Sequence, residues 1–102
     1  MAPRRADPGN ARDVDSDGFS ADGKDAGSLA PAVSRAAQVL TVLADNGGQA
    51  AGPSELARRL SLPKSSIANI CGALADAGLV RRAGAGFALG RRVAELGGAY
   101  LA

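Results

Sequence analysis

Two short helical patterns, separated by only two residues, lie in the middle of this 102-residue chain. The first spans Gly52–Leu60, with Gly52 at a helix N-cap, Pro53 at the first helical position and Glu55 placed to reach back to the cap amide. The second spans Pro63–Gly78 and ends where glycine can adopt left-handed backbone. Two helices joined by so short a connector form a helix-turn-helix, and this restricts the fold more than any other feature.

The apolar positions of this unit are more specific than two generic helices require. Ala57 is the small residue that lets the helices approach each other. Large apolar residues lie one position before it and three, five, ten and thirteen after it: Leu56, Leu60, Leu62, Ile67 and Ile70. Ser61 takes a position that needs left-handed backbone and usually holds Gly, at an expected cost of about 1 kcal/mol that a packed three-helix core can offset.

The region before this unit divides into two parts. Apolar residues recur at helical spacing over Val33–Ala44, and the glycines of Asn46–Gly48 can end a helix, so a first helix is predicted there. Residues 1–29 are instead rich in Asp, Gly, Ala, Ser and Pro, with few large apolar residues. Such a composition buries too little surface to offset the entropy of ordering, which predicts a disordered tail.

The region after the unit predicts a small hairpin and one more helix. Two strands are expected over Leu79–Arg82 and Phe87–Leu89, with Gly84–Gly86 as their turn. A further helix is expected over residues 91–102, weakened by Gly97 and Gly98. The predicted fold is mainly α with a small β-hairpin, a winged helix-turn-helix over residues 30–90 followed by the start of a linker helix with no effector-binding domain after it.

Charge is unevenly distributed along the chain. Residues 1–29 carry four basic and six acidic side chains, whereas residues 30–102 carry eight basic and four acidic ones. The positive excess therefore falls in the part that is predicted to fold, as expected of a nucleic-acid binder. Only 3% of residues are aromatic, which argues against base flipping and single-strand stacking.

The residue types exclude several classes of function. There is no His, no plausible nucleophile with its base and no cluster of carboxylates over residues 30–102, so we expect neither an enzyme nor a metal or cofactor site. Cys71 is the single cysteine, flanked by core positions, and is predicted to be a small buried residue in a reducing cytoplasm. No secretory signal and no apolar run near ~20 residues is present, so no membrane partner is expected.

The run Val33–Gly90 resembles the N-terminal DNA-binding domain of IclR-type bacterial transcriptional regulators. The stretches that carry the resemblance are VSRAAQVLTVLA, SELARRLSLPKSSIANI, LADAGLV and FALG. It implies a third helix that enters the major groove, and a homodimer formed through the first helix and the linker helix. The family usually has His or a similar residue and then Arg where this chain has Ala68 and Asn69, so no base preference carries over. The family's effector-binding domain has no counterpart here, so no small-molecule effector site is expected.

Four polar residues near the start of the predicted recognition helix are candidate DNA contacts. Lys64 suits a phosphate or a guanine edge, Ser65 and Ser66 suit phosphates or bases, and Asn69 suits bidentate reading of adenine. A simpler interpretation is that these are solvated residues of an exposed helix face. The helix-turn-helix context favours contact with DNA.

Four more candidates lie outside that helix. Ser54 begins the second helix and could donate to a phosphate, and Arg35 matches an Arg of the resembling family. Arg81 and Arg82 flank the wing and could reach a neighbouring backbone or minor groove. Charged residues on an exposed strand also prevent edge pairing, which is the alternative role of these two.

These observations predict a bacterial cytoplasmic, nucleoid-associated protein that binds double-stranded DNA and regulates transcription, by repression. Two alternatives remain open. One is a winged helix that binds a protein instead of DNA, and the other is a truncated regulator that keeps the fold but dimerises poorly. Salt-dependent binding to duplex DNA separates the first from the proposed function, and the oligomeric state tests the second.

Overall fold

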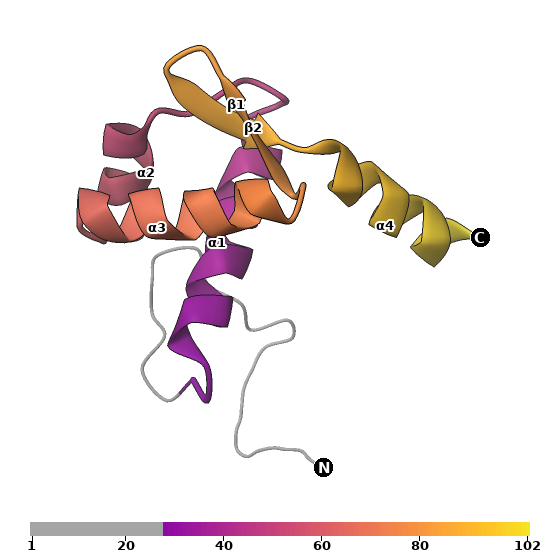
Figure 1. Ribbon diagram of the computed structural model, residues 1–102, viewed down its shortest axis with the longest axis horizontal. Coiled ribbons are helices and arrows are strands. Elements are labelled where there is room, and N and C mark those ends of the chain that lie inside the picture. Colours follow the sequence, from indigo (N-terminus) through magenta and orange to yellow (C-terminus); the bar gives the residue numbers. More distant parts are fainter. Residues whose placement is uncertain (1–27) are drawn as a thin grey trace.

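The computed structural model describes residues 28–102, and within them the chain forms four helices and a two-stranded antiparallel hairpin (Figure 1). The elements in chain order are α1 (Pro31–Asp45), α2 (Pro53–Leu60), α3 (Lys64–Asp76), β1 (Val80–Ala83), β2 (Gly86–Leu89) and α4 (Arg91–Leu101). The predicted mainly α fold with a small β-hairpin, a winged helix-turn-helix, is confirmed. The predicted disordered tail lies outside the described residues, apart from Ser28 and Leu29.

One apolar core joins the first three helices to the hairpin. Its buried members are Val39, Val42, Leu43, Ala51, Leu56, Leu60, Ile67, Cys71, Leu74, Val80 and Phe87. Each helix contributes one face because its apolar residues recur every three or four positions. Burial of each large aliphatic side chain contributes about 1.5–3 kcal/mol, so this small cluster supplies most of the driving force for folding.

The first helix begins and ends on local signals. Pro31 starts α1, two residues before the predicted Val33, because proline is favoured at the first helical position. The helix ends before Asn46, and Gly47 takes a positive φ of 65°, as the sequence predicted. The side-chain Nδ2 of Asn46 then donates to the carbonyl oxygen of Gln49 at 2.9 Å, which shapes the loop that leads to α2.

The turn between α2 and α3 has the strained backbone that the sequence predicted. Ser61 adopts left-handed φ and ψ of 57° and 45°. The amide of Leu62 donates to the carbonyl oxygen of Ala57 at 3.0 Å, and this hydrogen bond caps the C-terminal end of α2. The predicted start of α3 is wrong by one residue, because Pro63 is extended at the N-cap and the helix begins at Lys64. Gly78 has a φ of 78° and follows the end of α3, as predicted.

The hairpin is shifted by one residue from its predicted strands. β1 starts at Val80 rather than Leu79, and Gly86 pairs with Ala83 instead of belonging to the turn, which is left with two residues. Residue 86 must be glycine because the chain at Ala51 passes so closely that an added Cβ would lie 2.6 Å from the Ala51 carbonyl oxygen. The backbone groups of Ala51 and Phe87 exchange two hydrogen bonds of 2.9 Å, so the wing is attached to the segment that enters α2.

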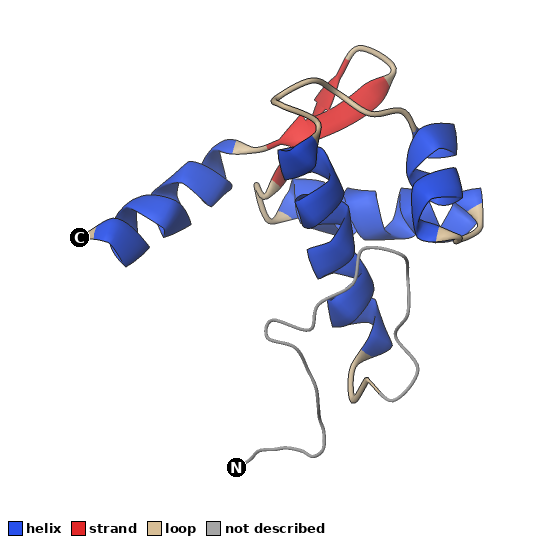
Figure 2. Ribbon diagram, turned by 180° about the vertical axis from the view of Figure 1, so that it is seen from behind, coloured by secondary structure: helices blue, strands red, loops and turns tan. Residues whose placement is uncertain are grey.

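The fourth helix extends away from the three-helix body. Both views show α4 leaving the end of the hairpin and projecting on its own (Figures 1 and 2). No residue of α4 is buried, and its large apolar side chains Leu96, Tyr100 and Leu101 are exposed. None of the helices in residues 28–102 has the length and apolar character needed to cross a membrane.

Candidate nucleic-acid interface

The first turn of α3 presents polar groups to solvent. Lys64 and Ser65 are exposed and Ser66 is half-buried. The N-cap is Pro63, whose side chain can cap nothing, so the first amide N–H groups of the helix have no partner from that residue. A helix N-terminus of this kind carries partial positive charge, and the Lys64 ammonium adds a full charge beside it.

Helical spacing places Asn69 on the same exposed face as Ser65, one turn further along α3. The opposite face of the helix carries Ile67 and Cys71, which are fully enclosed in the core. The core therefore fixes the rotation of α3 and leaves this polar face turned outwards. Of the candidates on α3, Ser66 departs most from this face, since it is partly covered.

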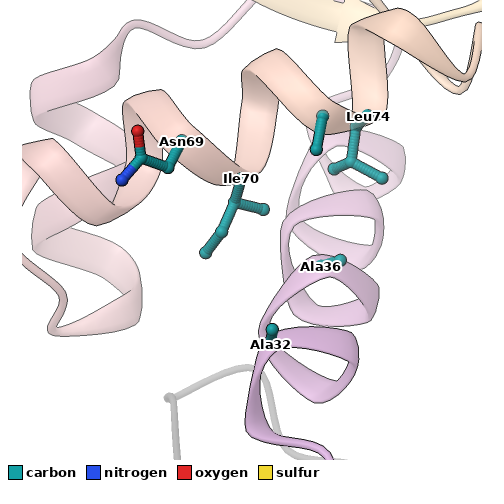
Figure 3. A pocket seen from close by; sticks show the side chains of 6 residues that line it. Ala32, Ala36, Asn69, Ile70 and Leu74 are labelled. Carbon is teal, nitrogen blue, oxygen red and sulfur yellow. The ribbon is translucent and has the colours of Figure 1, made fainter.

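Asn69 also borders a hollow that the sequence did not predict. The hollow of about 290 Å³ lies between α3 and the N-terminal half of α1, and is lined by Ala32, Ala36, Asn69, Ile70, Ala73 and Leu74. Figure 3 shows Ile70 and Leu74 pointing from α3 toward α1, where Ala32 and Ala36 lie, with Asn69 at one edge. Small residues on α1 leave this space open, and nothing in its lining other than Asn69 carries a polar side chain.

The exposed face of α2 carries two polar residues that lie close together, Ser54 and Arg58. Ser54 lies in the first turn of α2, and Arg58 follows four residues later on the same side of the helix. Arg59 instead forms an ion pair with Glu55, with 3.7 Å between Nη1 and Oε2. The Glu55 carboxylate therefore faces Arg59 rather than the cap amide. Arg58 was not among the residues predicted from the sequence to contact DNA, although its spacing of four residues from Ser54 is a signal that could have identified it.

The two arginines of β1 have different environments. The guanidinium of Arg82 lies 5.5 Å from the centre of the Phe87 ring, and these two residues are paired across the hairpin. Arg81 points to the other face, as successive residues of a strand do, and is exposed. It borders a hollow at the start of α4 together with Arg91 and Arg92. Arg81 is thus the wing arginine with the freer side chain.

Two further residues named from the sequence have side chains that are at least partly covered. Arg35 is half-buried on α1. Cys71 is fully buried in the core, and burial raises the pKa of its thiol, with the nearby positive charge of Arg82 opposing that rise. The thiol is therefore protonated at neutral pH, and its predicted place as a small core residue is confirmed.

The described part of the chain has more basic than acidic groups on its surface. Both Glu55 and Glu95 form ion pairs with arginines of their own helices. Lys64, Arg58 and Arg81 form no ion pair within residues 28–102, so three cations on α3, α2 and the wing keep their full charge toward solvent. The same residues include no group of three potential metal ligands.

A family model matches this region of the chain. The model of the IclR helix-turn-helix domain covers residues 32–84, just over half of the chain, from the first turn of α1 to the turn of the hairpin. No curated protein and no solved structure matches the chain. The matched range contains every candidate contact residue on α1, α2, α3 and the wing.

Proposed function

Because the chain belongs to the IclR helix-turn-helix family, and therefore carries a DNA-binding domain of a transcription regulator, we propose that it acts as a dimeric repressor whose α3 lies in the major groove. One observation carries this placement of α3. The first turn of α3 has no side-chain cap and contains Lys64, which forms no ion pair within the described residues. The exposed polar face of the helix continues from this turn to Asn69.

Each candidate contact on α3 has a defined part in this proposal. Lys64 and the first amide groups of α3 bind a phosphate at the edge of the groove. Ser65 and Asn69 face the base edges, and Asn69 reads adenine through its amide. Ser66 is partly covered, so it contributes through its hydroxyl to the backbone rather than to a base.

The remaining contacts hold the domain on the backbone. Ser54 and Arg58 together bind a phosphate beside α2, because both lie on its exposed face. Arg81 reaches the backbone or minor groove next to the wing, whereas Arg82 stabilises the hairpin through Phe87 and contributes mainly its charge. Arg35 is the candidate on α1, and its contact is a phosphate reached from that helix.

A second copy of the chain completes the site. A single module touches few base pairs, so specificity requires two half-sites related by symmetry. The exposed apolar residues Leu96, Tyr100 and Leu101 of α4, with Val33 of α1, provide the surface for this dimer. Bound at a promoter, the dimer occludes polymerase.

Selection of genomic DNA fragments by the purified protein, at physiological salt and with excess non-specific duplex, tests the proposal. Enrichment of a two-fold symmetric motif is expected. The affinity for that motif should fall linearly with the logarithm of the salt concentration, since counterions are released from the phosphates.

Two variants separate the contact types. Lys64→Ala should weaken binding to all sequences alike and lower the salt slope by about 0.9, whereas Asn69→Ala should cost about 1–3 kcal/mol at one base position only. Uniform weakening by Asn69→Ala would contradict base reading, and an unchanged slope would remove Lys64 from the phosphate. Absence of duplex binding even at low salt would favour the protein-binding alternative.

A further inference from the structure

The start of α4 is joined to the end of α3 by main-chain hydrogen bonds. The amide of Arg92 donates to the carbonyl oxygen of Gly78 at 3.1 Å, and the amide of Gly90 donates to that of Leu79 at 2.9 Å. Leu79 in turn donates to Leu74 at 2.9 Å, in the loop that closes α3. These bonds connect two helices that are separated in sequence by the whole hairpin.

The close approach at this junction requires glycine. A Cβ on Gly90 would overlap the carbonyl oxygen of Gly78 and lie 2.9 Å from the amide nitrogen of Val80. Real Cβ atoms do not come so close to main-chain atoms, so any other residue would push α4 away from α3. Gly90 has an extended backbone that other residues adopt easily, so space and not conformation fixes its identity.

The glycines further along α4 have no such constraint. Gly97 and Gly98 would meet nothing within 4 Å if they carried a Cβ. The restriction therefore belongs to the junction and not to the helix. Within the first turn, Arg92 also forms an ion pair with Glu95 at 2.9 Å, which keeps the turn that carries the junction helical.

We propose that the contact between Gly78 and Gly90 is a rigid joint that sets the direction of α4 relative to the recognition helix α3, with Gly90 as its positioning residue. This inference rests on the proposed function, because α4 is taken to join two copies while α3 reads the groove. In such a dimer the angle at the joint fixes how far apart the two α3 helices lie. Two half-sites that lie on the same face of the DNA, one helical turn apart, are separated by about 34–36 Å. The joint therefore determines which spacing between half-sites the dimer can bind.

Residual dipolar couplings of backbone N–H groups test the joint directly and need no DNA. In the unmodified chain, the couplings of α3 and α4 should fit one alignment tensor. In Gly90→Ala, one tensor with the original orientation of α4 relative to α3 should no longer fit the couplings of both helices, while in Gly98→Ala, the matched control on the same helix, it should still fit them. Separate tensors in the unmodified chain would overturn the proposal, and this result does not depend on how well any variant folds.

Operator spacing gives the second readout. The Gly90→Ala protein should bind a single half-site with unchanged affinity. The ratio of its affinities for operators of the preferred spacing and of other spacings should fall about tenfold or more. Gly98→Ala should keep that preference. Retained spacing in a folded Gly90→Ala protein would overturn the role of Gly90. If the unmodified chain binds no duplex at all, the proposed function fails, and the dipolar couplings still decide whether the joint is rigid.

Discussion

Helices α1 and α4 are built from similar sequence patterns, yet they have opposite environments. Each carries apolar residues at helical spacing. In α1, Val39, Val42 and Leu43 are almost completely enclosed by the rest of the body. In α4, no side chain is buried, and 87% of Tyr100 is exposed.

The difference shows that an amphipathic pattern specifies a helix with an apolar face, but does not specify what that face packs against. α1 finds its partner within the chain, because α2, α3 and the hairpin close around it. α4 projects from the body after Gly90, and its apolar side chains are left exposed. Three substitutions test this contrast, in descending order of expected effect.

The largest effect is expected from truncation of a core residue of α1. Leu43→Ala removes a side chain that is 1% exposed, and should lower the free energy of unfolding by about 2–5 kcal/mol because it leaves a cavity. Denaturant titration followed by circular dichroism measures this. A loss below about 1 kcal/mol would mean that α1 is less firmly packed than its burial indicates.

The matched truncation in α4 should spare the fold and weaken the dimer. Leu96→Ala is expected to change the free energy of unfolding of the monomer by no more than about 0.5 kcal/mol. It should raise the dimer dissociation constant by about tenfold, since apolar surface is buried only between copies. Sedimentation equilibrium measures the second quantity. Equal dimer affinity in the two proteins would place the interface elsewhere.

The smallest effect is expected inside α4 itself. Gly98→Ala adds a methyl group in open space and removes a residue that disfavours helix, so α4 should gain about 0.5–1 kcal/mol of helix stability. The far-ultraviolet circular dichroism signal of helix should rise slightly, and slowed amide exchange should be confined to α4. A change spread over α1 to α3 would mean that the middle of α4 packs against the body more than its exposure indicates.

Sequence reasoning performed best where a local rule applies. It identified the helix-turn-helix from the spacing around Ala57, the left-handed Ser61, and the stops at Gly47 and Gly78. It failed by one residue at Pro63 and in the hairpin. In the hairpin, Gly86 pairs with Ala83 and lies against the chain at Ala51, and this contact with a distant segment has no local signal in the sequence.

The features of the candidate interface also divide into those that follow from local sequence and those that depend on tertiary packing. The polar face from Lys64 to Asn69 follows from one helix and its apolar face, and the sequence alone was enough to propose it. The stacking of Arg82 on Phe87 requires the register of the hairpin, and the hollow beside Asn69 requires the packing of α1 on α3. Neither arrangement has a local signal in the sequence.

The sequence by itself determined which segments are helical, where they stop, and which faces are apolar, because these properties depend on backbone preferences and on neighbours three or four residues away. Only the tertiary structure decided the register of the wing, the direction of α4 and the need for glycine at residue 90. Those features arise where main-chain atoms from distant segments approach within van der Waals distance. Such approaches depend on the packing of the whole core and not on any one segment.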